Sequence, residues 1–150
     1  MRTAAVLVIA AAIVMPAAAQ AASADLLFQQ FGLFGTWAID CQQPASTANP
    51  HVSITTPSVG QVQEEHDLGP NFAINHYSIV SAEQGSAEQL SVAVIFQPGD
   101  EGEERQKLTF LIRKGTRRTL FNQPDGGAVR VKDGVALAHG NKTPALKKCD

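Results

Sequence analysis

The chain has 150 residues, with 12 lysine and arginine residues against 14 aspartate and glutamate residues and a formal net charge of −2. A mildly acidic chain has no general electrostatic attraction to nucleic acid or to anionic lipid, so a nucleic-acid partner is not expected. Apolar residues make up 44% of the sequence, and a run near its start contributes many of them. No cofactor is expected.

The first 21 residues have the pattern of a secretory signal peptide. Arg2 supplies a positive charge, an apolar run extends from Ala4 to Ala19, and Ala19-Gln20-Ala21 offers a cleavage site with small residues. The run is shorter than the about 20 apolar residues of a membrane-spanning helix. We therefore expect residues 1–21 to be a signal peptide. Residues 22–150 should form a single domain that does not span a membrane and is periplasmic or secreted in a bacterium.

The chain has two cysteines, Cys41 and Cys149. Two cysteines in an exported protein most simply form one disulfide. The alternative is a pair of free, redox-active thiols, but the sequence has no C-x-x-C motif to support it. We predict a disulfide between Cys41 and Cys149.

Helical spacing follows the predicted signal peptide. In residues 24–34, ADLLFQQFGLF, the residues Leu27, Phe31 and Phe34 recur at helical intervals, and Gly32 interrupts the pattern. This favours a short N-terminal helix or turn that lies over one end of the domain.

The rest of the chain has the alternating pattern of short β-strands. In residues 35–41, GTWAIDC, every second residue from Gly35 to Cys41 is expected on one face. The clearest strands are residues 90–96, LSVAVIF, and residues 107–113, KLTFLIR. Their expected inward side chains are Leu90, Val92, Val94 and Phe96 in the first strand and Leu108, Phe110 and Ile112 in the second.

Turn signals separate these strands and indicate the fold class. Asp133-Gly134, between two strand-like runs, predicts a hairpin with a two-residue type I′ turn. About eight or nine strands, with turns roughly every eight to twelve residues, predict an all-β fold that is a sandwich or a barrel. We favour a single antiparallel β-barrel of about eight strands, because closure removes exposed strand edges. The alternative is a β-sandwich.

The triplet Gly35-Thr36-Trp37 resembles the G-x-W signature of the lipocalins and avidins, the calycin superfamily. The resemblance implies an up-and-down barrel in which Trp37 closes one end and a basic side chain from a late strand, with Arg130 as the candidate, covers the indole. The alternative is that Trp37 is an ordinary core side chain. Biotin binding is not implied, because the residues with which avidins hold biotin are not found. The longer pattern G-T-W-x-x-D-C-x-x-P-x-S-x-x-N-P, residues 35–50, is similar to small exported proteobacterial proteins of unknown function.

Catalytic and metal-binding motifs are not found. Residues 63–67, QEEHD, gather three carboxylates and a histidine, but in a strand they divide between two faces, and acid-rich strands usually face water. No G-x-S-x-G motif and no nucleophile with a recognisable base are present. We therefore predict neither an enzyme nor a metal site.

Residues 113–118, RKGTRR, concentrate positive charge at a predicted hairpin. The four basic residues are Arg113, Lys114, Arg117 and Arg118. They form a candidate anion patch for a phosphate-rich or carboxylate-rich partner, such as an envelope glycolipid. The alternative is a solvated hairpin tip without a partner.

Two functions follow from this reading. The leading hypothesis is a binding protein that holds a small apolar or amphipathic ligand inside a barrel open at one end. The alternative is a protein-interaction module, such as an inhibitor of a secreted hydrolase or an envelope assembly factor, with residues 22–34 as the segment that inserts into the partner.

Overall fold

A computed structural model describes residues 22–149, so the predicted signal peptide, residues 1–21, lies outside the described residues. Within the described range, one short helix and ten β-strands follow one another. Their bounds are α1 Ala24–Gln30, β1 Gly35–Ala38, β2 His51–Thr55, β3 Val62–Asp67, β4 Asn75–Ser86, β5 Gln89–Phe96, β6 Glu104–Arg113, β7 Thr116–Pro124, β8 Val131–Lys132, β9 Val135–Ala136 and β10 Leu146–Cys149. The predicted all-β fold with a short N-terminal helix is confirmed.

The strands form one antiparallel sheet that closes on itself. From β1 to β7, each strand pairs with its neighbour in the chain, and β10 pairs with both β1 and β7. In the described chain, eight strands therefore complete a barrel, as predicted, and not the alternative β-sandwich. The closing pair is short, because β10 and β7 pair at two positions, Leu146 with Arg117 and Lys147 with Thr116.

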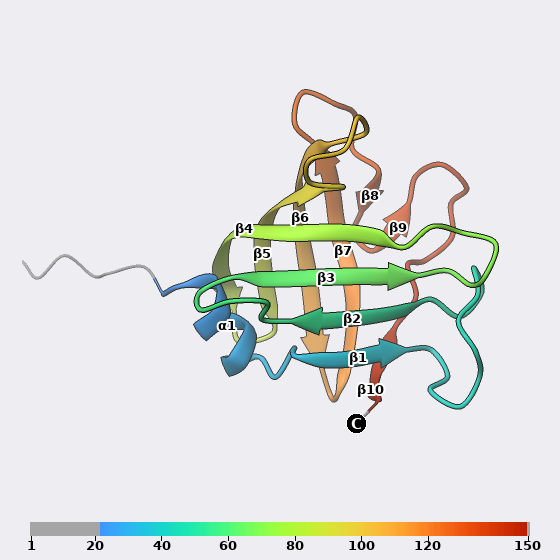
Figure 1. The fold of residues 1–150 in the computed structure, drawn as a ribbon, viewed down its shortest axis with the longest axis horizontal. Coiled ribbons are helices and arrows are strands. Elements are labelled where there is room, and N and C mark those ends of the chain that lie inside the picture. Colours follow the sequence, from blue (N-terminus) through green and yellow to red (C-terminus); the bar gives the residue numbers. More distant parts are fainter. Residues whose placement is uncertain (1–21, 150) are drawn as a thin grey trace, which may run out of the picture.

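Figure 1 shows that the barrel is flattened into two crossed layers. Strands β1–β4 run across the front, and β5–β7 and β10 run steeply behind them. The 12-residue strand β4 bends from the front layer toward the back, and its register shifts between Ile79 and Ser81. An irregularity of this kind lets a strand bend and leave one layer for the other.

Apolar side chains of β5 and β6 fill the interior. The alternation places the side chains expected to face inward on the core side, and five of them are at most 8% exposed: Leu90, Val92, Val94, Leu108 and Phe110. Phe96 and Ile112 are partly buried. The period-two pattern of these strands was therefore sufficient to assign their faces.

The helix α1 covers one end of the barrel, at the left of Figure 1. Leu27 and Phe28 of the helix, and Leu33 just after it, are at most 4% exposed and belong to the same core as the barrel strands. The segment lies over one end of the barrel, as its sequence pattern indicated. No helix of the described chain is long and apolar enough to cross a membrane.

The predicted hairpin and disulfide are both present. Asp133 and Gly134 have φ angles of 51° and 74° and join β8 to β9, and positive φ at both central residues is the mark of a type I′ turn. Cys41 and Cys149 form a disulfide with their Cα atoms 5.5 Å apart. The bond ties the loop after β1 to the end of β10.

The first strand is shorter than the sequence pattern indicated. It ends at Ala38, so Ile39, expected on the same face as the buried Trp37, is instead 40% exposed. The side chain of Asn49 causes this end: its Oδ1 accepts from the backbone N–H of Asp40, and its Nδ2 donates to the Asp40 carbonyl oxygen. These bonds fold the chain into a loop where the strand would have continued, and Cys41 lies exposed in that loop.

Candidate functional site

An ion pair is buried inside the barrel. Glu64 of β3, in the front layer, meets Arg117 of β7, in the back layer, and Nη2 of Arg117 donates to both carboxylate oxygens at 2.8 Å. The Glu64 and Arg117 side chains are 3% and 5% exposed. Glu64 faces inward because it alternates with the buried Val62 on the same strand.

Aromatic groups surround the pair. The guanidinium carbon of Arg117 lies 4.0 Å from the ring centroid of Phe110, within cation–π range. His66 Nε2 lies 3.1 Å from Glu64 Oε2, and the His66 ring packs on Tyr77 with centroids 4.6 Å apart. Both charged groups are therefore held in place by contacts on several sides.

The surroundings of the pair fix its charge state. Burial on its own would raise the pKa of Glu64, but the Arg117 charge, together with the contact to His66, lowers that pKa to about 2. Burial and the negative charge of Glu64 raise the pKa of Tyr77 to about 12. At neutral pH, Glu64 is ionised and Tyr77 is neutral.

A hollow of about 220 Å³ lies against this pair. We call it the interior hollow. Its apolar wall is formed by Val52, Leu108, Val131 and Leu146. Its polar wall includes the side chains of His66, Tyr77, Arg117, Arg118, Thr119, Asn122 and Thr143. Among the described residues, the lining contains two guanidinium groups and no carboxylate.

Two polar atoms at the interior hollow are buried without a hydrogen-bond partner among the described residues. They are Nη1 of Arg117, a donor, and Oδ1 of Asn122, an acceptor. A buried polar atom left unpaired typically costs about 1–3 kcal/mol, and such atoms in folded proteins usually find a partner. Neither atom is exposed to the hollow, so these two atoms belong to its buried wall.

A chain of hydrogen bonds fixes the orientation of Asn122. Its Nδ2 donates to Gln106 Oε1 at 2.9 Å, and Gln106 Nε2 in turn donates to Glu104 Oε1 at 2.7 Å. Arg130 holds the other end of the chain, since its two terminal nitrogens donate to the two Glu104 oxygens at 2.7 and 2.8 Å. The hydrogen bonds that Arg130 donates lower the pKa of the Glu104 carboxyl group. The amide nitrogen of Asn122 is thus hydrogen-bonded, and its amide oxygen is the atom without a partner in the described chain.

Comparison with protein-family models, with curated proteins and with solved structures found no match. A function for the interior hollow must therefore be argued from the chemistry of its own residues.

Trp37 is buried at 2% exposure near the end covered by α1, and its Nε1 donates to the Leu33 carbonyl oxygen at 2.7 Å. The cation over its ring is Lys148, with Nζ 6.0 Å from the ring centroid. The expectation of Arg130 in that place was wrong. Lys148 pairs in register with Trp37, whereas Arg130 follows β7 and is bound to Glu104.

The four residues of the predicted anion patch do not share one surface. Arg117 is inside the barrel, and Arg118 Nη2 donates to the Gly134 carbonyl oxygen at 2.8 Å. Arg113 and Lys114 are exposed at the hairpin tip, where Arg113 pairs with Glu88 at 3.3 Å. The prediction that these four residues form one anion patch was therefore wrong.

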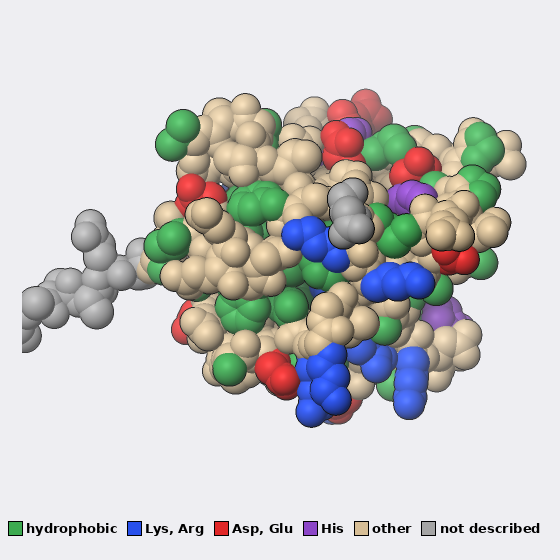
Figure 2. All heavy atoms as spheres, turned by 90° about the horizontal axis from the view of Figure 1, so that it is seen from below, with side chains coloured by type: hydrophobic (Ala, Val, Ile, Leu, Met, Phe, Trp, Pro, Cys, Tyr) green, Lys and Arg blue, Asp and Glu red, His purple; other side chains and the backbone are tan. Residues whose placement is uncertain are grey.

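The positive surface has a different composition from the predicted patch. Figure 2 shows blue side chains gathered on the face seen from below. Exposed Lys147 and Lys148 of β10 lie beside the β6–β7 hairpin, because Lys147 pairs with Thr116. Basic side chains on this side thus come from two strands that are distant in sequence.

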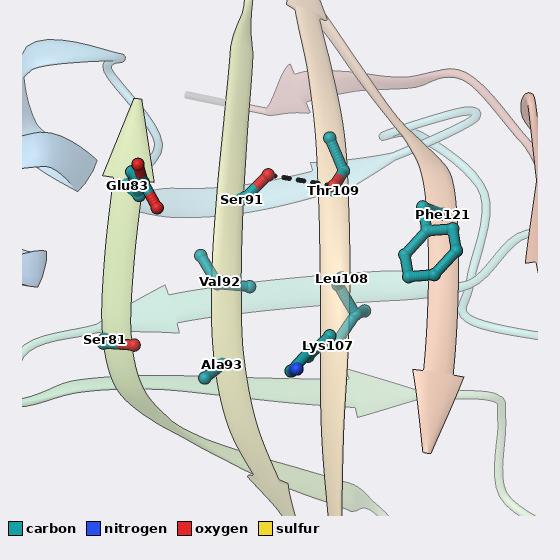
Figure 3. Close-up of a pocket in the computed structure, with 9 residues that line it drawn as sticks. All are labelled: Ser81, Glu83, Ser91, Val92, Ala93, Lys107, Leu108, Thr109 and Phe121. Carbon is teal, nitrogen blue, oxygen red and sulfur yellow. Dashed lines mark hydrogen bonds between the residues drawn. The ribbon is translucent and has the colours of Figure 1, made fainter. Parts of the chain in front are cut away.

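A second hollow, of about 280 Å³, lies on the outer face of strands β4–β7 (Figure 3). Its lining combines small residues with Glu83, Lys107 and Phe121, and the hydroxyls of Ser91 and Thr109 hydrogen-bond to each other at 3.0 Å. Figure 3 shows Phe121 at one side of this hollow and Glu83 at the other. Although larger, it is the weaker candidate, because none of its lining side chains contributes a buried atom without a partner in the described chain.

The side chains of the acidic stretch QEEHD point alternately to the two faces of strand β3, as predicted. Glu64 and His66 face the interior, while Glu65 contacts His76 at 3.3 Å on the outside. Within the part of the chain that the structure describes, no three His, Cys, Asp or Glu side chains converge to hold a metal ion.

Sequence analysis placed neither Arg117 nor Asn122 at an interior site. For Arg117 a signal was available: a two-residue turn at Lys114-Gly115 pairs Arg113 with Thr116, and alternation then sends Arg117 inward, opposite Ile112. For Asn122 there was none, because a register shift in β7 reverses the alternation after Thr119.

Proposed function

We propose that this protein is an exported binding protein that holds a small amphipathic molecule in the interior hollow. The observation that carries the proposal is the interior hollow itself, in which an apolar wall stands opposite polar residues beside the buried Glu64–Arg117 pair. An apolar ligand body would cover Val52, Leu108 and Leu146, and its polar groups would face the polar wall. We assign no reaction to the site.

The volume of the interior hollow limits the ligand. A cavity of about 150 Å³ holds one benzene molecule. A hollow of about 220 Å³ therefore accommodates about nine non-hydrogen atoms by the same measure. The ligand, or the part of it that enters the barrel, is a small molecule rather than a long lipid chain.

The disulfide supports a site of action outside the cytoplasm. Disulfides persist in oxidising compartments and are rare in the cytosol. The Cys41–Cys149 bond agrees with the signal-peptide pattern of residues 1–21, and together they support a periplasmic or secreted protein.

The packing of α1 argues against the alternative of an interaction module. That alternative used residues 22–34 as a segment that inserts into a partner. Phe28 and Leu33 of this segment are 0% exposed in the core of the protein itself. Releasing them would uncover the barrel end, so the segment is better explained as a permanent cover, and small-molecule binding is favoured.

Native mass spectrometry of the protein purified without denaturation, followed by thermal melting with a panel of small amphiphiles, tests the proposal. We expect a bound small molecule or a melting temperature that rises with ligand concentration, because a ligand of the folded state stabilises it. Val131→Phe should fill the hollow and abolish both effects. Lys132→Phe adds the same ring at the next position of β8, outside the lining, and should preserve them. Absence of any adduct and of any stabilisation would refute the proposal.

A further inference from the structure

Acidic and basic residues occupy different halves of the chain. No lysine or arginine lies between Arg2 and Arg105, whereas 11 of the 14 acidic residues lie in that stretch. The remaining 11 lysine and arginine residues all follow, from Arg105 onward. The formal net charge of −2 therefore conceals a strong separation of charge along the sequence.

The fold converts this separation in the sequence into a separation in space. Strands β1–β4, in the front layer of Figure 1, contain acidic residues and no lysine or arginine, and β5 contains no charged residue. The basic residues belong to β6–β10 and their connections, and β6, β7 and β10 run behind the front layer (Figure 1). The front layer is therefore the negative side of the barrel, and the strands behind it carry the positive charge.

One edge of β7 is covered in turn by three segments of the basic half. β10 pairs with β7 at Thr116, the hydroxyl of Thr143 donates to the Thr119 carbonyl oxygen at 2.6 Å, and β8 pairs with β7 further along. β9 completes a hairpin with β8. These segments form one border along the edge of β7.

Each of these three segments carries an exposed lysine: Lys147, Lys142 and Lys132. Lys132 and Lys142 both pair with Val135, so their side chains share one face. Lys132 and Lys147 each follow a residue that lines the interior hollow, so alternation directs both lysines away from the interior. We call these three lysines, together with Lys114 at the tip of the adjoining β6–β7 hairpin, the basic band.

No lysine of the basic band has a carboxylate partner among the described residues, where every ion pair involves histidine or arginine. The acidic residue next to the band in sequence is Asp133, which is exposed in the β8–β9 turn. Lysine carries a compact, hydrated charge on a flexible stem and lacks the planar fork with which arginine matches one carboxylate. Such side chains suit a diffuse anionic surface better than a single shaped anion.

An exposed apolar side chain lies beside the basic band. Leu137 directly follows β9 and is 53% exposed. Its N–H donates to the Arg130 carbonyl oxygen at 2.8 Å, which holds it against the hairpin that carries Lys132. A soluble polyanion offers such a leucine no apolar contact, whereas a membrane interface accepts apolar side chains beneath its charged headgroups.

We infer that the basic band docks the protein on the surface of an anionic lipid bilayer. The four lysines lie at the level of the lipid phosphates, and Leu137 enters the interface between the headgroups. A second copy of the chain fits less well, because a symmetric contact through the band places positive charge on positive charge. A contact between the front of one copy and the back of the next has no closed end. The inference goes beyond the proposed function and does not depend on what the interior hollow binds.

Co-sedimentation of the mature protein with vesicles of phosphatidylcholine, with and without phosphatidylglycerol, tests the inference. We expect binding to the anionic vesicles only, and a steep loss of binding as salt is added. Each lysine near an anionic surface contributes about fivefold to binding, so Lys142→Gln should weaken it about fivefold and Lys132→Gln/Lys142→Gln/Lys147→Gln about 100-fold. Arg105→Gln removes the same charge from an exposed position of β6 outside the band and should preserve binding.

Leu137→Trp reports directly on insertion into the bilayer. Its emission should shift to shorter wavelength when anionic vesicles are added, because the indole leaves water. Val59→Trp is the matched control, since Val59 is 100% exposed in the loop between β2 and β3 of the front layer, and its emission should not shift. Trp37 is buried in the core and gives a constant background in both variants.

Three results would overturn the inference. The first is equal binding to neutral and anionic vesicles, and the second is an equal loss of binding in Arg105→Gln and Lys142→Gln. The third is binding to a soluble polyanion, dextran sulfate, without any emission shift of Leu137→Trp on vesicles, which would assign the basic band to a polyanion. The amphiphile panel examines the interior hollow separately, so the proposed function stands or falls independently of these results.

Discussion

Glu64 and Arg117 have each lost almost all contact with water, so each charge depends on the other for its solvation. Removing one member of such a pair typically costs 3–5 kcal/mol, whereas replacing both with apolar residues of similar volume is often close to neutral. The pair is thus weak evidence for stability as such. Its role in the proposed function is to place a fixed, buried pair of charges beside the interior hollow.

The pKa of Glu64 makes a prediction about acid stability. Because this pKa is lowered to about 2 in the folded protein, against an ordinary value of 4.5, the ionised form stabilises the fold above pH 4.5. That contribution is lost as the pH falls from 4.5 toward 2. A difference of this size corresponds to about 3 kcal/mol. Urea denaturation at a series of pH values measures it.

The control for this prediction is the double variant Glu64→Leu/Arg117→Met, which removes the titrating group and its partner together. It should lose less free energy of unfolding than the wild type between pH 4.5 and 2. Equal losses in both proteins would show that other carboxylates carry the acid sensitivity and that Glu64 does not.

Single residues also show where sequence analysis succeeded and where it did not. Cys41 and Cys149 were paired correctly, since an exported chain with two cysteines leaves few alternatives. Arg117 was assigned to a surface patch because its neighbours in sequence are basic, although the turn geometry directs it inward. Asn122 depends on one extra residue in β7, and sequence periodicity contains no information about such a bulge.

At the scale of elements, the helix α1 is a structural cover rather than an arm. A seven-residue helix is too short to be stable alone, so it is held by the side chains that it buries in the barrel. Its pattern in the sequence indicated its place, while strands β5 and β6 were predictable because one face of each is largely apolar. The order of strands around the barrel, and hence the meeting of β3 with β7, could not be read from any local pattern.

The helix offers a matched pair of substitutions. Phe28 is 0% exposed and Leu26, on the same helix, is 44% exposed. Phe28→Ala should lower the free energy of unfolding by about 3–5 kcal/mol, because it removes a large side chain from the core and leaves a cavity. Leu26→Ala should change it by less than about 1 kcal/mol. Denaturant unfolding followed by Trp37 fluorescence measures both, and similar effects would contradict the role of α1 as a core cover.

At the scale of the whole molecule, the barrel has one weak line, the seam between β7 and β10. Two residue pairs close it, whereas β5 and β6 pair at eight positions. The disulfide lies at the end of β10, so it restrains the strand that completes the barrel. Leu146 of that strand is also part of the wall of the interior hollow, so closure of the barrel would be linked to the ligand binding that we propose.

Reduction of the Cys41–Cys149 bond should therefore affect the seam before the rest of the sheet. The bond spans a sequence separation of 108 residues, and the chain-entropy model gives about 4.7 kcal/mol for a loop of about 100 residues, so reduction should lower the melting temperature by several degrees. Native-state hydrogen exchange should show where the protein opens. Amides of β10 should exchange by local opening and lose the most protection, while amides of β5 and β6 should still exchange by global unfolding.

The variant Cys41→Ser/Cys149→Ser gives the same comparison without a reductant. In this variant a ligand found with the amphiphile panel should bind more weakly than in the oxidised protein, because the free seam must close before Leu146 can cover that ligand. Bound ligand should in turn restore protection to β10 more than to β5, since the two equilibria are linked. An equal loss of protection in all strands, or unchanged affinity, would mean that the seam does not open independently and that the disulfide stabilises the barrel only as a whole.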